Sequence, residues 1–124
     1  MAYDEQIASE VRRALSRLVR QPDEEIDTVR MFGGLCFTLN KKMLVGVAGT
    51  RLVIRLSDDD FDEAYSEGKA TPMDFTGRPM RNFAYIASHA FATDEELLGW
   101  ISRSAAYVRT NVLLSSAKSK RGKS

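Results

Sequence analysis

Apolar and polar residues alternate along this chain with two different periods, which divide it into helices and strands. From residue 3 to about residue 20, apolar residues recur at spacings of three and four, with charged residues between them. This period predicts an amphipathic helix, and Pro22 predicts its end because proline lacks the N–H group that another turn needs. The apolar face of this helix comprises Ile7, Val11, Leu15, Leu18 and Val19.

A period of two follows the acidic linker at residues 22–25 and predicts short strands. Residues 26–31 are the first of them. Residues 35–39 and 43–47 lie on either side of the polar turn Asn40-Lys41-Lys42, an arrangement typical of a β-hairpin.

A tight turn at Gly49-Thr50 leads into another alternating segment, residues 51–56. In a strand, Arg51, Val53 and Arg55 share one face, and the leucines and the isoleucine share the other. The succession of strands and turns predicts an antiparallel meander.

The second half of the chain carries capping signals for two helices. Ser57 precedes three aspartates, so residues 58–66 predict a short helix capped by the serine hydroxyl, and Gly68 suits its exit. Thr93-Asp94-Glu95-Glu96 matches a capping box, so we expect a long helix from there to about residue 113.

The segment between these helices is interrupted by residues that break regular structure. Residues 70–79 include Pro72, Gly77 and Pro79 and predict a loop. Residues 81–87 then predict one more strand. The aromatic side chains that share a face of this strand are Phe83 and Tyr85.

Together these elements predict an α+β fold, in which an N-terminal helix, a short central helix and a long C-terminal helix pack on an antiparallel meander sheet. The 124 residues, of which 44% are hydrophobic and 28% charged, suit one domain. We expect that domain to span residues 1–113. Residues 114–124 predict a disordered basic tail, because serine and lysine bury too little apolar surface to fold.

The formal net charge of +1 is unevenly distributed. Residues 115–124 hold four basic residues and no acid, which leaves a net charge of −3 on the rest of the chain. The tail could therefore bind nucleic-acid phosphates weakly and in a salt-sensitive way, or it could simply aid solubility. No aromatic residue is interleaved there for base stacking. The basic residues are Lys118, Lys120, Arg121 and Lys123.

The acidic N-terminus and the lack of a long apolar segment predict neither a signal peptide nor a membrane span, and hence a cytoplasmic protein. Cys36 is the only cysteine, which excludes an intrachain disulfide. Because His89 is the only histidine, the usual Cys/His zinc sites cannot form within one chain. A Cys36–His89 catalytic dyad stays open as an alternative, although nothing in the sequence predicts that these residues meet.

One acidic cluster resembles a calcium-binding loop in its spacing. Asp58, Asp60 and Asp62 match the first, third and fifth ligand positions, but Glu63 occupies the place of the required glycine and Lys69 that of the bidentate glutamate. The cluster is better interpreted as a helix start with a solvated acidic face. We therefore expect no metal, no cofactor and no catalytic residue.

Two adjacent glycines interrupt the strand-forming residues of the first half. Gly33 and Gly34 follow Met31 and Phe32, and glycine permits both a bend and the close approach of another group. The spacing does not match a phosphate-binding loop, and a strand rather than a helix follows. We predict a structural bulge, with Met31-Phe32-Gly33-Gly34 as a candidate interaction motif.

Two further groups of residues are candidates for a binding surface. Arg51 and Arg55 could form an anion-binding or partner-binding face, or they could be ordinary charges on the solvent side of a half-covered sheet. Met73, Phe75 and Met80 could form an adaptable contact surface, or they could pin the predicted loop to the core, which is the favoured interpretation.

The order of these features resembles the N-terminal domain of the TfoX/Sxy family. The shared features are an initial helix, the Met31-Phe32-Gly33-Gly34 segment, a hairpin with Lys42-Met43-Leu44, the pairs Pro72-Met73 and Pro79-Met80, and a last helix with Asp94 to Leu98 and Trp100. The resemblance covers about residues 8–112 and implies a stand-alone α+β domain of YjbR-like fold without catalytic residues. Family members that regulate competence carry a second domain and act with the cyclic-AMP receptor protein at promoters.

We therefore predict a non-enzymatic binding or regulatory module, a monomer or homodimer, that contacts a protein partner, with transcription regulation as its candidate role. The alternative is a nucleic-acid-associated protein that uses the basic tail and the face with Arg51 and Arg55. An enzyme is the third hypothesis, and it would require a pocket that joins Cys36 or His89 to acidic groups.

Overall fold

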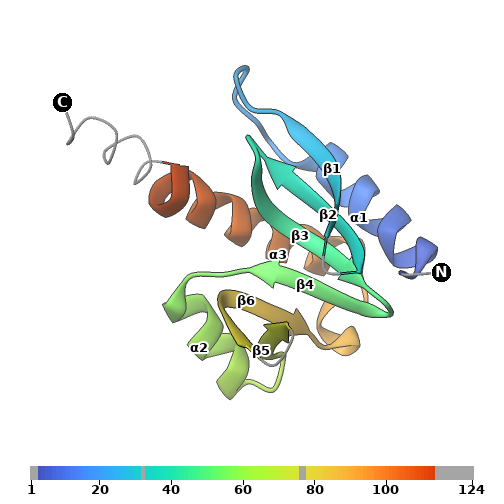
Figure 1. Ribbon diagram of the computed structural model, residues 1–124, viewed down its shortest axis with the longest axis vertical. Helices are drawn as coiled ribbons and strands as arrows, with labels where there is room; N and C mark the ends of the chain where they lie inside the picture. The colour runs from blue at the N-terminus through green and yellow to red at the C-terminus, as the bar shows by residue number, and fades with distance from the viewer. Residues whose placement is uncertain (1–2, 32, 76–77, 114–124) are drawn as a thin grey trace.

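One antiparallel sheet with helices on a single face makes up the part of the chain that the computed structural model describes, residues 3–31, 33–75 and 78–113 (Figure 1). In these residues six strands lie in the spatial order β1-β2-β3-β4-β6-β5. The strands are β1 (Ile26–Met31), β2 (Gly34–Leu39), β3 (Lys42–Ala48), β4 (Arg51–Arg55), β5 (Ala70–Phe75) and β6 (Arg78–Ile86).

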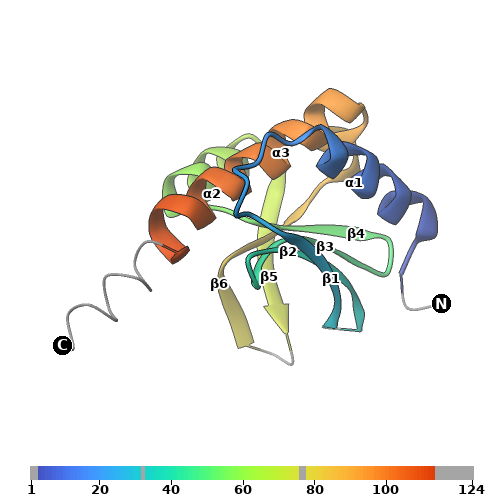
Figure 2. The same cartoon turned by 90° about the horizontal axis from the view of Figure 1, so that it is seen from above.

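The helices form a layer on one side of the sheet, as Figure 2 shows. The predicted α+β fold is confirmed, with an N-terminal, a short central and a long C-terminal helix. Among the described residues, no helix is long and apolar enough to span a lipid bilayer. The helices are α1 (Glu5–Arg17), α2 (Asp58–Ser66), the 3-10 helix η1 (Ser88–Phe91), α3 (Asp94–Tyr107) and the π-helical segment η2 (Val108–Leu113).

Helix α1 begins where predicted but ends earlier. The Asp4 carboxylate accepts hydrogen bonds from the backbone N–H groups of Gln6 and Ile7, which caps the first turn. The helix ends at Arg17 because Leu18 adopts an extended conformation and turns into the core, where it is buried. Two predictions were therefore wrong: the helix does not continue to about residue 20, and Val19 does not belong to its apolar face, since it is 82% exposed.

The other helix caps are confirmed. The Ser57 hydroxyl accepts a hydrogen bond from the backbone N–H of Asp60 at 3.1 Å, so α2 starts where the sequence predicts. At the start of α3, Thr93 and Glu96 exchange the two bonds of a capping box. The regular α-helix ends at Tyr107, and the remaining predicted helical residues form η2.

The segment predicted as a loop is a strand. Residues 70–75 form β5, which pairs with β6 and occupies an edge of the sheet. Pro72 is compatible with this position because an edge strand can lose one N–H donor without breaking a central ladder, and the register shifts just after it. The meander prediction holds for β1 to β4, but β4 pairs with β6 and β5 is displaced to the outside.

A bulge in the β2–β3 hairpin connects the sheet to α3. Phe37 pairs with Val45 and Thr38 with Met43, so Leu44 is an extra residue in β3. Its backbone carbonyl accepts a hydrogen bond from the buried Ser104 hydroxyl of α3 at 2.9 Å. The bulge thus directs a carbonyl group out of the strand ladder to satisfy a polar side chain in the helix–sheet core.

The glycine pair lies at the end of a hairpin. Met31 pairs with Gly34 across antiparallel strands, and Gly33 has a positive φ of 71°. The prediction of a bulge at this point was therefore wrong, whereas the predicted close approach is confirmed. A Cβ atom on Gly34 would overlap the carbonyl oxygen of Val47 in β3 and lie 3.0 Å from the Cα atom of Ala48.

We expect Gly34→Ala to lower the free energy of unfolding by about 2–4 kcal/mol, because the obstructing atoms belong to the backbone of β3 and cannot move aside like a side chain. Gly99→Ala is the matched control. A Cβ on Gly99 meets no atom within 4 Å, and alanine is the better helix former, so we expect a gain of about 0.5–1 kcal/mol. Urea denaturation measures both, and equal effects would contradict the close approach.

An ion pair ties the segment between α1 and β1 to η2. The Arg109 guanidinium donates two hydrogen bonds of 2.8 Å to the Glu24 carboxylate and one of 2.9 Å to the carbonyl of Val19. The Glu24 side chain is only 7% exposed. These hydrogen bonds from Arg109 lower the pKa of Glu24, which burial alone would raise.

Because the pKa of Glu24 is lowered on folding, its contribution to stability is present above the pKa of the unfolded carboxyl, about 4.3, and is lost as the pH falls through the folded-state value. We expect Glu24→Gln to cost about 1–3 kcal/mol at neutral pH and progressively less in acid. Glu5→Gln removes an exposed 3.9 Å pair with Arg12 and should cost no more than about 0.5 kcal/mol. Urea denaturation across a pH series tests this, and a pH-independent effect of Glu24→Gln would contradict it.

Candidate interaction surface

The helix-free face of the sheet carries a second, smaller apolar cluster. Strand β4 contributes to both faces, since Leu52 and Ile54 pack in the core with the helices while Val53 lies on the opposite side. We call the side chains on this opposite side the open face. Its buried members are Cys36, Met43, Val53 and Met73, and its partly buried members are Ala48, Phe83 and Tyr85.

The sheet curves around this open face. In Figure 2, β1 and β2 at one end and β5 and β6 at the other bend away from the helical layer. The side chains of five different strands can therefore meet on the face without a helix above them. The four buried residues of the cluster are no more than 5% exposed, which shows how closely their neighbours cover them.

Arg51 and Arg55 lie on this face, and each guanidinium group lies over an aromatic ring of β6. The guanidinium carbon of Arg55 is 4.7 Å from the ring centroid of Phe83, its directly paired residue. That of Arg51 is 4.6 Å from the ring centroid of Tyr85, its diagonal neighbour, because Tyr85 pairs with Val53. Both distances are those of cation–π interactions.

Unlike Arg12, Arg13 and Arg17 of α1, the two arginines have no ion-pair partner among the described residues. Within the described part of the chain, neither Arg51 nor Arg55 forms an ion pair, whereas Arg13 pairs with Asp94 at 3.3 Å. Burial lowers the pKa of the Arg55 guanidinium, and the nearby Tyr107 acts in the opposite direction. The charge of Arg55 is thus partly removed from water and faces an aromatic ring in place of a carboxylate.

The packing of the buried residues of the open face, which we call its floor, depends on a second glycine. A Cβ atom on Gly46 of β3 would lie 2.9 Å from the terminal methyl group of Met43 and 3.2 Å from the Cys36 sulfur. Its absence leaves room for these two side chains on the sheet. Next to them, the hydroxyl group of Thr38 is buried and has no hydrogen-bond partner among the described residues.

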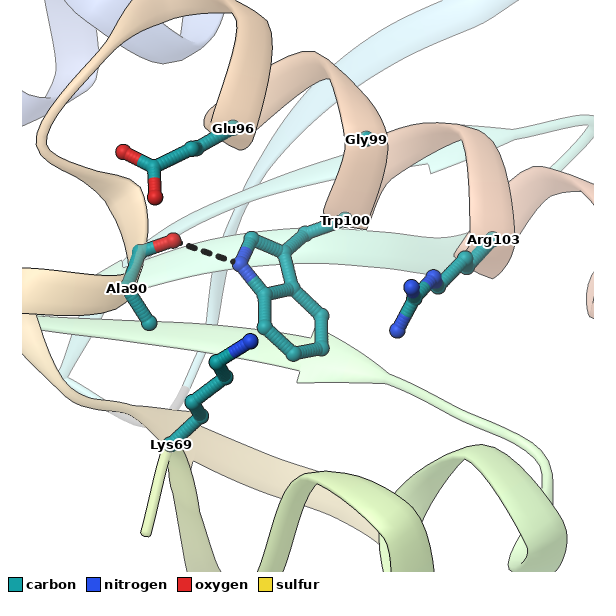
Figure 3. Close-up of a pocket in the computed structure, with 6 residues that line it drawn as sticks. All are labelled: Lys69, Ala90, Glu96, Gly99, Trp100 and Arg103. Carbon is teal, nitrogen blue, oxygen red and sulfur yellow. Dashed lines mark hydrogen bonds between the residues drawn. The ribbon is translucent and has the colours of Figure 1, made fainter. Parts of the chain in front are cut away.

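A hollow of about 180 Å³ lies beside Trp100 on the other side of the molecule. Figure 3 shows the residues that line it. The indole N–H donates a hydrogen bond of 2.9 Å to the carbonyl of Ala90, and the Arg103 guanidinium lies 5.1 Å from the indole ring. Lys69 and Arg103 already pair with carboxylates of Glu67 and Glu63, at 3.1 and 4.0 Å. The hollow is smaller than most ligand pockets, and its cations are neutralised, so it is best explained as packing between elements.

The other residues with candidate chemistry lie apart from the open face or are covered by it. His89 is exposed in η1, whereas Cys36 is buried in the open-face cluster, and no hydrogen bond joins them in the residues that the structure describes. Burial raises the pKa of the Cys36 thiol to about 11. The acidic cluster at the start of α2 forms part of the helix cap, and Asp58 accepts a hydrogen bond from the Asn82 side chain at 2.9 Å. No group of metal ligands occurs among the described residues.

Of the other residues that the sequence singled out, some lie in the sheet and some lie outside the described ranges. Met31 and Gly34 form the last pair of the β1–β2 hairpin, at the end of the sheet. Met73 is 1% exposed, so it is buried as the favoured interpretation required, but it lies in a strand and in the open-face cluster and does not pin a loop to the main core. Phe32 and the basic tail, with Lys118, Lys120, Arg121 and Lys123, lie outside the described residues, as do the side chains of Phe75 and Met80.

The sequence did not predict that Arg51 and Arg55 contact the aromatic rings of Tyr85 and Phe83. The alternation along residues 81–87 correctly places Phe83 and Tyr85 on one face. The missing information was the register between β4 and β6, which brings an arginine of one strand over a ring of the other. Such a register depends on contacts between segments about thirty residues apart and has no local signal.

The fold and this surface define a small α+β domain with one helix-covered and one open sheet face. Residues 5–107 match the family model described as the TfoX N-terminal domain, and the chain belongs to this family. The match spans every element from α1 to α3, and the family resemblance found in the sequence is thus confirmed. No curated protein matches the chain.

We expect the Cys36 thiol to react with a disulfide reagent at neutral pH at least about a hundredfold more slowly in the native protein than in urea, because burial both covers the sulfur and raises its pKa. The native rate should rise in step with unfolding as urea is added. Stopped-flow absorbance measures the release of the reagent's thiol. Rapid labelling without urea would contradict the burial of the open-face cluster.

Proposed function

We propose that this domain is a non-enzymatic binding module that contacts a protein partner through the open face. The observation that carries the proposal is the pairing of Arg51 and Arg55 with Tyr85 and Phe83 around the apolar floor at Val53. Arginine, tyrosine, phenylalanine and methionine are the residue types that protein interfaces favour in their cores. On this face they occur together and without a helix over them.

Two further features support binding over catalysis. A thiol with a pKa near 11 is almost entirely protonated at neutral pH and is a poor nucleophile, which argues against chemistry at Cys36. The fixed positions of the arginines also reduce the entropy that a partner would have to overcome on binding. A regulatory role, in transcription regulation, is the function that the family resemblance favours.

Nucleic-acid binding is the second candidate, because arginines and aromatic rings on a sheet face are also features of RNA-binding domains. In this sheet, however, the guanidinium groups of Arg51 and Arg55 lie over the rings that bases would stack on. Under this alternative, affinity for duplex DNA should fall steeply with salt and fall further after deletion of residues 115–124. Absence of binding at low salt would exclude it.

Two exposed valines provide a matched test of the open face. Val29 is 43% exposed and pairs with Cys36, so both residues lie on the open face, whereas Val19 is 82% exposed in the segment after α1. We expect Val29→Glu to remove the partners that the unmodified protein captures from a cell extract, because it places a charge next to Cys36, at the β1 side of the open face. Val19→Glu should retain them, as measured by affinity capture and quantitative mass spectrometry.

Thermal denaturation of both variants serves as the folding control, because neither valine is buried. Capture of the same partners by all three proteins, at equal abundance, would show that the open face is not the contact surface. Loss of the partners with Val19→Glu alone would assign the contact to the helical side.

A further inference from the structure

We infer that the segment of the partner that docks on the open face is acidic, with two carboxylates that pair with Arg51 and Arg55. This inference rests on the proposed function and specifies its partner. It follows from three features of the surface: the unmatched charges, their spacing and the aromatic rings beside them.

The first feature is the absence of acidic partners. In the described residues, the carboxylates that form ion pairs belong to the helices, to the segment between α1 and β1 and to the connection between α2 and β5. Asp27 of β1 shares the open face, since it pairs with Thr38. It is three strands away from β4, about 14 Å at the usual strand spacing. The described residues thus leave Arg51 and Arg55 without an acidic partner, and a bound segment could supply one.

The second feature is the spacing of the two arginines. Their backbones are four residues apart on β4, which corresponds to about 13 Å, but their guanidinium groups lie over Tyr85 and Phe83, which are two residues apart on β6, or about 7 Å. An extended segment on this face would match these spacings with acidic residues two or four positions apart. The expected patterns are therefore acid-x-acid and acid-x-x-x-acid.

The third feature is the way the rings hold the guanidinium groups. The guanidinium carbons of Arg51 and Arg55 lie 4.6 and 4.7 Å from the ring centroids of Tyr85 and Phe83, and a guanidinium group beside a ring can still donate two N–H groups to a bidentate carboxylate. A carboxylate should bind more strongly at Arg55 than at Arg51. The charge of Arg55 is already partly withdrawn from water, and a carboxylate would compensate that desolvation. The two guanidinium groups are thus already positioned to bind carboxylates in the free protein.

The same features favour a protein segment over nucleic acid. A nucleic acid presents a phosphate at every nucleotide, and tight binding neutralises many of them. Two guanidinium groups on either side of an apolar floor match two separated acids better than they match a continuous row of phosphates.

A random peptide library displayed on phage tests the inference with the full chain as bait. We expect the enriched peptides to carry two acidic residues two or four positions apart. Synthetic copies in which asparagine or glutamine replaces both acids should bind at least about tenfold more weakly in fluorescence anisotropy. The Arg51→Gln/Arg55→Gln variant should lose affinity for the acidic peptides to a similar extent.

The matched control is Arg13→Gln/Arg17→Gln, which removes two arginines at the same sequence spacing from α1, where they pair with Asp94 and Glu95. It should bind the acidic peptides as the unmodified protein does. If the double variant on β4 unfolds, Arg51→Gln alone replaces it, because Arg51 is exposed. Arg51→Lys should retain only part of the affinity, since lysine keeps the charge without the bidentate fork.

The outcomes separate the inference from the proposed function. Enriched peptides that lack acids but lose binding with Val29→Glu would overturn the acidic pattern and leave the open face as the contact surface. Peptides that bind the β4 double variant and Val29→Glu as tightly as the unmodified protein would overturn both. A single-stranded oligothymidine that binds through Arg51 and Arg55 at physiological salt, when no acidic peptide does, would assign the face to nucleic acid.

Discussion

The architecture depends on the alternation of side chains along β4. One face of this strand packs against the helices, and the other lies on the open face. Leu52 and Ile54 are completely buried against the helices, and a shift by one residue would exchange them with Arg51, Val53 and Arg55. Burying two arginines in an apolar core would be prohibitively costly. The helical layer therefore sets the register of the central strands, and this register in turn decides which side chains reach the open face.

The open face shows how a sheet can remain partly apolar without a second helical layer. Small and flexible residues, Gly46, Cys36 and Met43, form a low floor, and the arginines of β4 extend over the rings of β6. The stems of these arginines cover apolar surface while their charged ends stay near water. The arrangement protects the sheet in the free protein and at the same time presents charge at defined positions to a partner.

Local signals predicted the elements whose ends are set by nearby residues. The Ser57 cap and the Thr93 capping box located two helix starts, and the alternation of residues 26–56 located four strands. The errors arose where a distant contact outweighed the local signal. Residues 70–75 are a strand in spite of Pro72 because β6 supplies a pairing edge, and α1 ends early because the core accepts Leu18.

By itself, the sequence determined the α+β class and the family. It also determined that Arg51, Val53 and Arg55 lie on the strand face opposite the leucines. These properties follow from periodicity and from short motifs, which act within a few residues. Only the tertiary structure decided that the glycine pair closes a hairpin against β3 and that the arginines lie over Tyr85 and Phe83. The physical reason is that strand pairing and register are set by the simultaneous burial of all the strands against one helical layer.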